Sequence, residues 1–170
     1  EADALNLPEQ PDEALERKLL VVRKRAEHEL GRKTVDHSPN CYAASFSGRT
    51  LVYKGMMIAP QVPKFYPDLT DVRLVSALAV VHQRYSTNTF PSWPLAQPFR
   101  MLAHNGEINT LQGNLNWMRA HEIRMAASAF GDRDQEVKPV VQPGGSDSAA
   151  LDNVFEVLVR AGRPAPLAKA

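Results

Sequence analysis

Two short apolar runs, each followed by a cluster of polar residues, constrain most strongly what this chain can fold into. Leu78–Val81 and Met101–Ala103 have the length and composition typical of short buried strands. The first leads into polar residues that begin at Arg84, and the second leads directly into His104–Glu107. Neither cluster has an evident structural role. We therefore expect the two strand ends to contribute to one shared site.

The composition is that of one globular domain. Of the 170 residues, 44% are hydrophobic, which is enough for a core. A length of 170 residues is short of what two domains need. A formal net charge of +1 does not favour nucleic acid or anionic lipid as a partner. No apolar run approaches the roughly 18 residues that span a bilayer. The only cysteine, Cys41, excludes an internal disulfide and a cysteine-rich metal site, and is consistent with a reducing, cytoplasmic compartment.

A helix is predicted from about residue 11 to residue 31. Its apolar positions recur at spacings of three and four and are Leu15, Leu19, Val22, Ala26 and Leu30. The charged residues between them could form a basic binding stripe, but a solvated helix face is the favoured interpretation. They are Arg17, Lys18, Arg23, Lys24, Arg25, Glu27 and Glu29.

Two more helices are predicted further along the chain. One covers residues 109–129, and Trp117 is expected to pack it on a sheet. The other begins at Ser146 or Asp147, either of which could cap it, and ends near Gly162.

The remaining elements are predicted to be strands and short turns of helix. Residues 41–46 and 50–54 have the pattern of a β-hairpin, and residues 139–143 that of a short edge strand. Residues 56–71 hold three prolines and favour a short helix with loops. The sequence thus predicts an α+β fold with antiparallel sheet.

Three residues have both a chemical and a structural interpretation. Arg84 could bind a carboxylate bidentately or form a structural ion pair. Asn105-Gly106 could be an oxyanion hole or a hairpin turn. Asp147 could receive an ammonium group or cap a helix. Residue type alone slightly favours the structural interpretation each time, and for Cys41 it strongly favours an inert buried thiol over a nucleophile.

Taken together, the motifs resemble the glutaminase domains of the glutamate synthases, which are class II glutamine amidotransferases. The resemblance rests on residues 84–100, 104–110, 113–114, 116–118 and 145–148. Its most specific part is the run Thr-Phe-Pro-Ser-Trp-Pro-Leu at residues 89–95. It implies an N-terminal-nucleophile hydrolase fold, an αββα sandwich with two antiparallel sheets between helical layers, which would be truncated in this chain.

The resemblance also implies a binding site for L-glutamine. Arg84 would hold the α-carboxylate, with Tyr85 and Thr87 lining the pocket. Asp147 would hold the α-ammonium group, with Gly145 beside it.

Asn105 and the Gly106 N–H would stabilise the oxyanion that forms when a thiolate attacks the glutamine side-chain amide. In the family this thiolate belongs to a cysteine at the mature N-terminus, whose α-amino group is the base. This chain starts with Glu1, and Cys41 has no free amine. Residues 1–170 are therefore interpreted as a single partial domain without its nucleophile segment, and we expect the 170-residue chain alone to be inactive.

In a whole enzyme of this family, the ammonia would convert 2-oxoglutarate to glutamate. The resemblance implies FMN, an iron–sulfur cluster and NAD(P)H or ferredoxin for that enzyme, with no cofactor or metal in this segment. The implied partners are L-glutamine, the remainder of the polypeptide and a small reductase subunit. No nucleic acid or membrane is implied, and the compartment would be the cytoplasm, or a plastid in a plant or alga.

Two other functions remain open at this stage. One is a catalytically silent glutamine-binding module with a regulatory or structural role, which the genomic reading frame around the segment would distinguish. The other is a cysteine hydrolase that uses Cys41, which needs an accessible, low-pKa thiol that iodoacetamide would alkylate at neutral pH.

Overall fold

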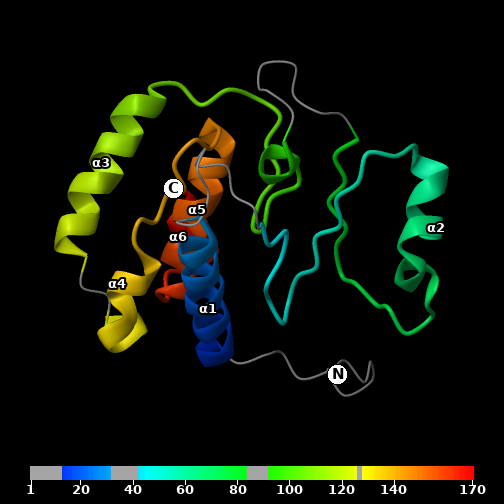
Figure 1. Ribbon diagram of the computed structural model, residues 1–170, viewed down its shortest axis with the longest axis horizontal. Coiled ribbons are helices and arrows are strands. Elements are labelled where there is room, and N and C mark those ends of the chain that lie inside the picture. Colours follow the sequence, from blue (N-terminus) through cyan, green and yellow to red (C-terminus); the bar gives the residue numbers. More distant parts are fainter. Residues whose placement is uncertain (1–12, 32–41, 84–91, 126–127) are drawn as a thin grey trace.

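In the computed structural model, every regular element of the described residues, 13–31, 42–83, 92–125 and 128–170, is a helix (Figure 1). The α-helices are α1 (Glu13–Gly31), α2 (Val62–Phe65), α3 (Leu111–Arg124), α4 (Asp134–Val137), α5 (Asp147–Arg160) and α6 (Ala165–Lys169). The 3₁₀ helices are η2 (Ala59–Gln61), η3 (Pro67–Thr70), η4 (Trp93–Leu95) and η5 (Ser128–Arg133).

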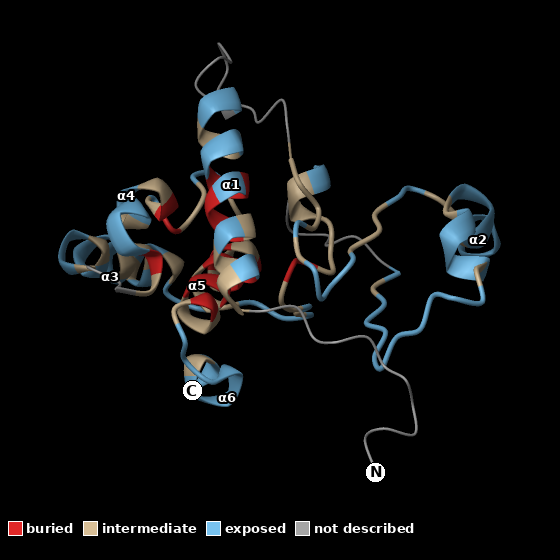
Figure 2. Ribbon diagram, turned by 90° about the horizontal axis from the view of Figure 1, so that it is seen from below, coloured by how far each residue is buried: buried red, intermediate tan, exposed pale blue. Residues whose placement is uncertain are grey.

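The helices form a cluster with an arm at its side. Helix α1 packs against α4, α5 and η5, while α6 packs against α5. Helix α2, with η2 and η3, lies away from the cluster in both views of the chain (Figures 1 and 2). The buried apolar residues that form the core of the cluster are Leu20, Val21, Phe130, Val137, Val140 and Val157. These side chains come from α1, η5, α4, α5 and the segment before α5.

The predicted helices are confirmed, although the α-helix predicted over residues 109–129 ends at Arg124. The ends of α1 and α5 follow local chemistry. Helix α1 carries Glu13 and Glu16 in its first turn, where carboxylates favour the positive end of the helix dipole. Ser146 is the N-cap of α5, and its Oγ accepts a hydrogen bond from the Ala149 N–H at 3.2 Å. Gly162, with φ of +98°, follows the end of α5.

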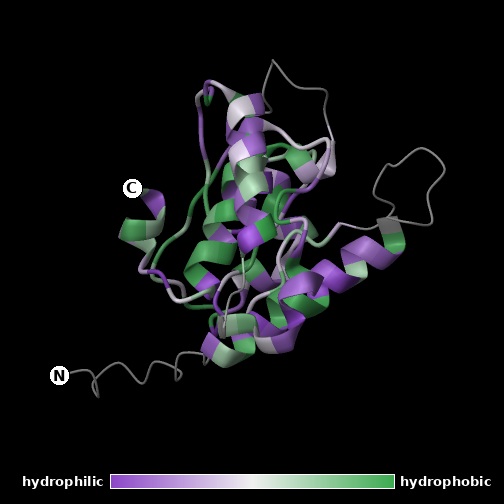
Figure 3. Cartoon of the chain, turned by 90° about the vertical axis from the view of Figure 1, so that its left-hand side faces the viewer, coloured by the Kyte–Doolittle hydropathy of each residue, from purple (hydrophilic) through white to green (hydrophobic). Residues whose placement is uncertain are grey.

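The solvated-face prediction for α1 is wrong at Arg23, Lys24 and Glu27, whose side chains are almost completely buried. Conversely, Leu15 and Val22 of the predicted apolar face are exposed. The buried residues of α1 are Glu16, Leu20, Val21, Arg23 and Lys24. Helix α5 behaves similarly, since its fully buried positions are mostly polar. Hydrophilic and hydrophobic residues are interleaved along the helices of the cluster (Figure 3).

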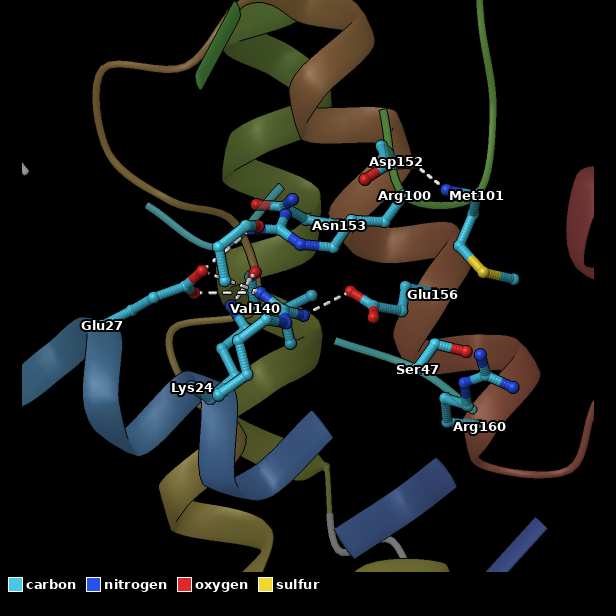
Figure 4. A network of polar contacts seen from close by, with 12 residues as sticks. Lys24, Glu27, Ser47, Arg100, Met101, Val140, Asp152, Asn153, Glu156 and Arg160 are labelled. Atoms are coloured by element: carbon cyan, nitrogen blue, oxygen red, sulfur yellow. Dashed lines mark hydrogen bonds and ion pairs between the residues drawn. The ribbon is translucent and has the colours of Figure 1, made fainter. Parts of the chain in front are cut away.

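The reason is that complementary charges surround α1 inside the cluster (Figure 4). Ion pairs connect it to its neighbours, and they include Arg23 to Glu156 at 2.5 Å, Glu27 to Arg100 at 2.8 Å and Glu16 to Arg160 at 2.6 Å. A charge leaves water only where a partner replaces its hydration. The pattern of one helix contains no information about such partners, so the rule that charges face solvent fails here.

The antiparallel sheet sandwich is also wrong for the part of the chain that the structure describes, because no strand occurs there. Residues 42–46, 50–54, 78–81, 101–103 and 139–143 are non-helical segments without strand pairing. Val81, predicted to be buried, is 83% exposed. A pattern of apolar residues predicts a strand only on the assumption that another strand lies beside it.

Side chains occupy the backbone groups that a neighbouring strand would otherwise pair. The Val52 N–H donates to Ser45 Oγ at 3.1 Å within the predicted hairpin. In the predicted edge strand, Lys24 Nζ donates to the Pro139 and Val140 carbonyls at 2.9 and 2.6 Å, and the Val140 N–H donates to Glu122 Oε1 at 2.7 Å. Buried backbone groups need a partner, and in residues 139–143 the helices α1 and α3 supply it.

Trp117 does not pack its helix against other structure, in contrast to the prediction. Its side chain is 79% exposed, and Ile123 on the same helix is exposed as well. Helix α3 instead contacts the core through Met118. None of the described helices combines the length and apolar character that crossing a membrane requires.

Candidate functional site

The loop from His104 to Ile108 lies against the first turn of α5. The Ile108 N–H donates to Asp147 Oδ2 at 2.6 Å. Four residues earlier, the His104 ring contacts Ser148, with 3.2 Å between Nδ1 and Oγ. Two of the motifs predicted to share a site, residues 104–107 and 145–148, are therefore adjacent in the fold.

Asp147 carries a negative charge at this contact. Burial works to raise the pKa of its carboxyl, but hydrogen bonds from the Ile108 and Ser148 N–H groups outweigh burial, and the pKa lies below its usual value. Oδ1 accepts the Ser148 N–H at 2.6 Å, and its position in the first turn of α5 favours an anion further. Two carboxylate oxygens offer about four acceptor positions, so Oδ2, with one donor, has room for another.

The middle of the loop is open to solvent. Asn105, Gly106 and Glu107 are exposed, whereas His104 and Ile108 on either side are half-buried. Within the part of the chain that the structure describes, the Asn105 amide makes no hydrogen bond. A Cβ on Gly106 would lie 3.2 Å from His104 Cε1, so an alanine would press on the ring that contacts Ser148. The loop thus presents amide donors beside an anchored histidine.

A glycine turn places Asp147 at the start of α5. Gly144 has φ of +76°, a conformation that side-chain-bearing residues rarely adopt. Gly145 follows, and a Cβ there would lie 3.4 Å from the Gln142 carbonyl oxygen. Ser146 then caps the helix, so the predicted choice between Ser146 and Asp147 as N-cap is decided in favour of Ser146. The Asp147 carboxylate binds the loop instead.

Two further side chains hold the loop, and neither was predicted from the sequence. The Gln97 side-chain amide bonds both backbone groups of His104: the N–H donates to Oε1 and Nε2 donates to the carbonyl, each at 2.5 Å. Asp152 Oδ1 accepts the N–H groups of Met101 and Leu102 at 2.8 and 3.2 Å. A signal for Gln97 existed, because it lies inside the motif of residues 84–100. For Asp152, a carboxylate on a helix of mixed polarity, no such signal existed.

Burial shapes the chemistry of Asp152. The side chain is 0% exposed, and burial raises its pKa above the usual value despite the hydrogen bond from the Met101 N–H. Its Oδ2 atom has no hydrogen-bond partner among the described residues. Asp152 therefore anchors the chain that leads into the loop and has no access to a ligand.

Four residues singled out from the sequence lie outside the described residues: Arg84, Tyr85, Thr87 and Cys41. Among those described, Asn105, Gly106, Gly145 and Asp147 come from two segments that the Ile108–Asp147 bond joins. An ionised carboxylate beside exposed amide donors suits a ligand with a cationic end and a polarised carbonyl. The described residues contain no cluster of His, Cys, Asp and Glu side chains that could hold a metal ion.

Comparison with known proteins gives one family and a consistent set of relatives. The family described as Glutamine amidotransferases class-II matches residues 4–170. The chain is 56% identical over 158 residues to the glutamate synthase [NADPH] large chain of Azospirillum brasilense, covering 93% of this chain and 10% of that protein. It is 48% identical over 151 residues to glutamate synthase [NADH] of Saccharomyces cerevisiae, covering 89% of the chain and 7% of the relative.

A third relative belongs to a plant. Ferredoxin-dependent glutamate synthase 1, chloroplastic/mitochondrial, of Arabidopsis thaliana is 46% identical over 149 residues, which cover 88% of this chain and 9% of that protein. The chain thus spans about a tenth or less of the length of these relatives.

Proposed function

Because the chain belongs to the class II glutamine amidotransferases, we propose that it forms the glutamine-binding and oxyanion-stabilising part of the glutaminase site of a glutamate synthase. Residues 1–170 would then be one partial glutaminase domain. The relatives that share the sequence carry glutamate synthase names, which supports this assignment over other members of the class.

One observation carries the proposal: the 2.6 Å hydrogen bond from the Ile108 N–H to Asp147 Oδ2. It joins the loop with the exposed Asn105 amide and Gly106 N–H to an ionised carboxylate. Free glutamine has an ammonium group at one end and an amide carbonyl at the other. The anion and the donors therefore match the two groups of the substrate that must be held during hydrolysis.

The proposed chemistry begins with the ammonium group at Asp147, where Oδ2 can accept one more hydrogen bond. A thiolate adds to the carbon of the side-chain amide, and the carbonyl oxygen becomes an oxyanion. The Asn105 amide and the Gly106 N–H donate to that oxygen, and such donors stabilise the transition state by about 3–4 kcal/mol each. The base returns the proton that it took from the thiol to the amide nitrogen, so collapse of the intermediate releases ammonia and leaves a thioester. Water then cleaves the thioester to glutamate and the free thiol.

The remaining contacts follow from the family resemblance. Arg84 would bind the α-carboxylate, with Tyr85 and Thr87 beside it and Gly145 allowing the backbone close to the ligand. The thiolate would come from a cysteine that is not Cys41, because a mid-chain cysteine has no α-amino group to act as base.

In the whole protein, the ammonia would pass to 2-oxoglutarate to form glutamate. That step needs a reductant, and the relatives are named for NADPH, NADH or ferredoxin. An iron–sulfur cluster would lie elsewhere in the polypeptide, since Cys41 is the only cysteine here. The FMN that the family resemblance implies would also be bound outside this segment. A small reductase subunit is the proposed protein partner, and the cytoplasm or a plastid is the proposed compartment.

The test is Asp147→Asn in the complete polypeptide that contains this chain. Losing one partner of a desolvated charge pair costs about 2–5 kcal/mol, so kcat/KM for glutamine should fall by roughly thirty-fold or more. Glutamate synthesis driven by added ammonia should continue, because ammonia does not use this pocket. Both rates are measured with a thermal melt of the same preparation.

Ser146→Ala is the matched structural control. It removes the cap of α5, worth about 1 kcal/mol, and leaves the Asp147 charge in place. Its glutamine-driven rate should stay close to that of wild type. If Asp147→Asn behaves like Ser146→Ala, Asp147 has only a structural role and the proposed binding site is wrong. Glutamine binding without any ammonia release by wild type would instead identify a silent binding module.

A further inference from the structure

We propose that Gln97 is a positioning residue for the oxyanion loop, an inference that rests on the function proposed above. The Gln97 amide forms two hydrogen bonds with the backbone of His104, both at 2.5 Å. His104 directly precedes Asn105 and Gly106. Gln97 therefore fixes the peptide from which the two proposed oxyanion donors project.

At neutral pH, a primary amide of this length provides what the His104 backbone needs. The His104 N–H requires an acceptor and its carbonyl requires a donor, and the two must lie side by side. The same requirement fixes the orientation of the amide, with Oε1 toward the N–H and Nε2 toward the carbonyl. In a sheet a neighbouring strand would supply this pair of bonds, and here one side chain does so.

Gln97 itself projects from a fixed segment. Lys54 Nζ donates to the carbonyl of Ala96, the residue before Gln97, at 2.5 Å, and to that of Trp93 at 3.3 Å. On the other side, the Phe99 N–H donates to the Leu102 carbonyl at 2.8 Å. The amide is thus held from both directions and can act as a rigid reference for the loop.

The loop is anchored on both sides and exposed in the middle. Gln97 and Ser148 hold His104, while Asp147 holds Ile108. Asn105 and Gly106, which lie between these anchors, are exposed to solvent. Loss of the Gln97 bonds would let Asn105 and Gly106 rotate away from the developing oxyanion. Because the oxyanion exists only in the transition state, the loss should appear in kcat and leave KM nearly unchanged.

The test compares Gln97→Met and Gln97→Glu in the complete polypeptide. At pH 8, where a glutamate carboxylate lacks the donor, both variants should lower the glutamine-driven kcat by about 10- to 100-fold. A protonated carboxylic acid presents a donor and an acceptor side by side, as the amide does. As the pH falls toward about 5, Gln97→Glu should regain kcat relative to wild type at the same pH, and Gln97→Met should not.

Gln112→Met is the matched control, because Gln112 is exposed on α3 and bonds only Asn116 among the described residues. Ammonia-driven synthesis and a thermal melt report on folding. The proposal would be overturned if the two Gln97 variants lost kcat equally at every pH, or if only KM rose. It would also be overturned if both the glutamine-driven and the ammonia-driven rates were lost together with a drop in melting temperature. If Asp147→Asn lowers the glutamine rate but the Gln97 variants match wild type, this inference alone fails. If Asp147→Asn has no effect, the proposed function is wrong, and the inference that rests on it is wrong as well.

Discussion

Lys24→Met should remove a specific part of the pH dependence of unfolding. Lys24 is 1% exposed, and its ammonium group has two backbone carbonyls, those of Pro139 and Val140, as acceptors. Burial, assisted by the nearby charge of Arg23, lowers its pKa from 10.5 to about 8, although Glu27 and Glu156 oppose this effect. A methionine has a similar shape and no charge to desolvate.

The size and sign of the effect follow from these two pKa values. Each unit corresponds to about 1.4 kcal/mol, so the difference between 10.5 and about 8 amounts to about 3 kcal/mol. Between these pH values the unfolded chain binds the proton and the folded chain does not, so Lys24 makes stability rise with pH. Below pH 8 both states are protonated, and the contribution of Lys24 is constant and destabilising.

The measurement is urea denaturation of the wild-type chain and of Lys24→Met at several pH values from about 7 to 10.5. Circular dichroism should follow the helices, because Trp93 and Trp117 are exposed and report poorly on burial. Other groups titrate in both proteins, so the difference between the two curves isolates Lys24. As the pH rises, the free energy of unfolding of wild type should increase by about 3 kcal/mol relative to that of Lys24→Met.

Lys18→Met controls for the loss of one lysine charge from the exposed side of α1. Methionine at position 24 also leaves two carbonyls without their donor, which shifts the whole curve by an amount that does not depend on pH. Parallel curves for wild type and Lys24→Met would therefore refute the reasoning, since they would mean that Lys24 loses its proton equally readily in the folded and unfolded states.

Two other substitutions test the structural corrections. Glu156→Gln removes the charge that pairs with Arg23 at 2.5 Å and should lower the free energy of unfolding by about 3 kcal/mol, measured by the same denaturation; a change under 0.5 kcal/mol would contradict burial of the pair. Trp117→Ala should change it by less than about 0.5 kcal/mol, because the indole is 79% exposed, and a loss of about 3 kcal/mol would mean that the ring is packed after all.

The helices were predictable because their signals are local. The run of residues from Glu13 to Gly31 carries its own start and stop, and Ser146 caps α5 with its own side chain. The strands were not predictable in the same way, because a strand is defined by a partner elsewhere in the chain. In residues 139–143 the partners are Lys24 and Glu122, each more than fifteen positions away.

The residues of the candidate site also differ in how far they could be predicted from the sequence. Asn105, Gly106 and Asp147 were singled out because the family resemblance implies roles for them, whereas residue type alone slightly favoured a turn and a helix cap. The 104–108 loop does meet the start of α5. Gln97 was missed because its role depends on the backbone of His104, seven residues away, and not on its own chemistry. Residue type indicates which group can touch a substrate, but not which group holds that residue in place.

The buried ion pairs connect the fold to the candidate site, because α5 takes part in both. At its first turn Asp147 holds the loop, and two turns later Glu156 holds Arg23 of α1. The ion pair joins residues 133 positions apart, and no local pattern reports such a distance. Buried pairs are also screened less by salt than exposed pairs, so this contact persists at ionic strengths that weaken surface charges. The charged faces of α1 and α5 therefore fix the helix that carries Asp147, the proposed ligand of the substrate ammonium group. The exposed middle of the 104–108 loop remains available to bind the substrate.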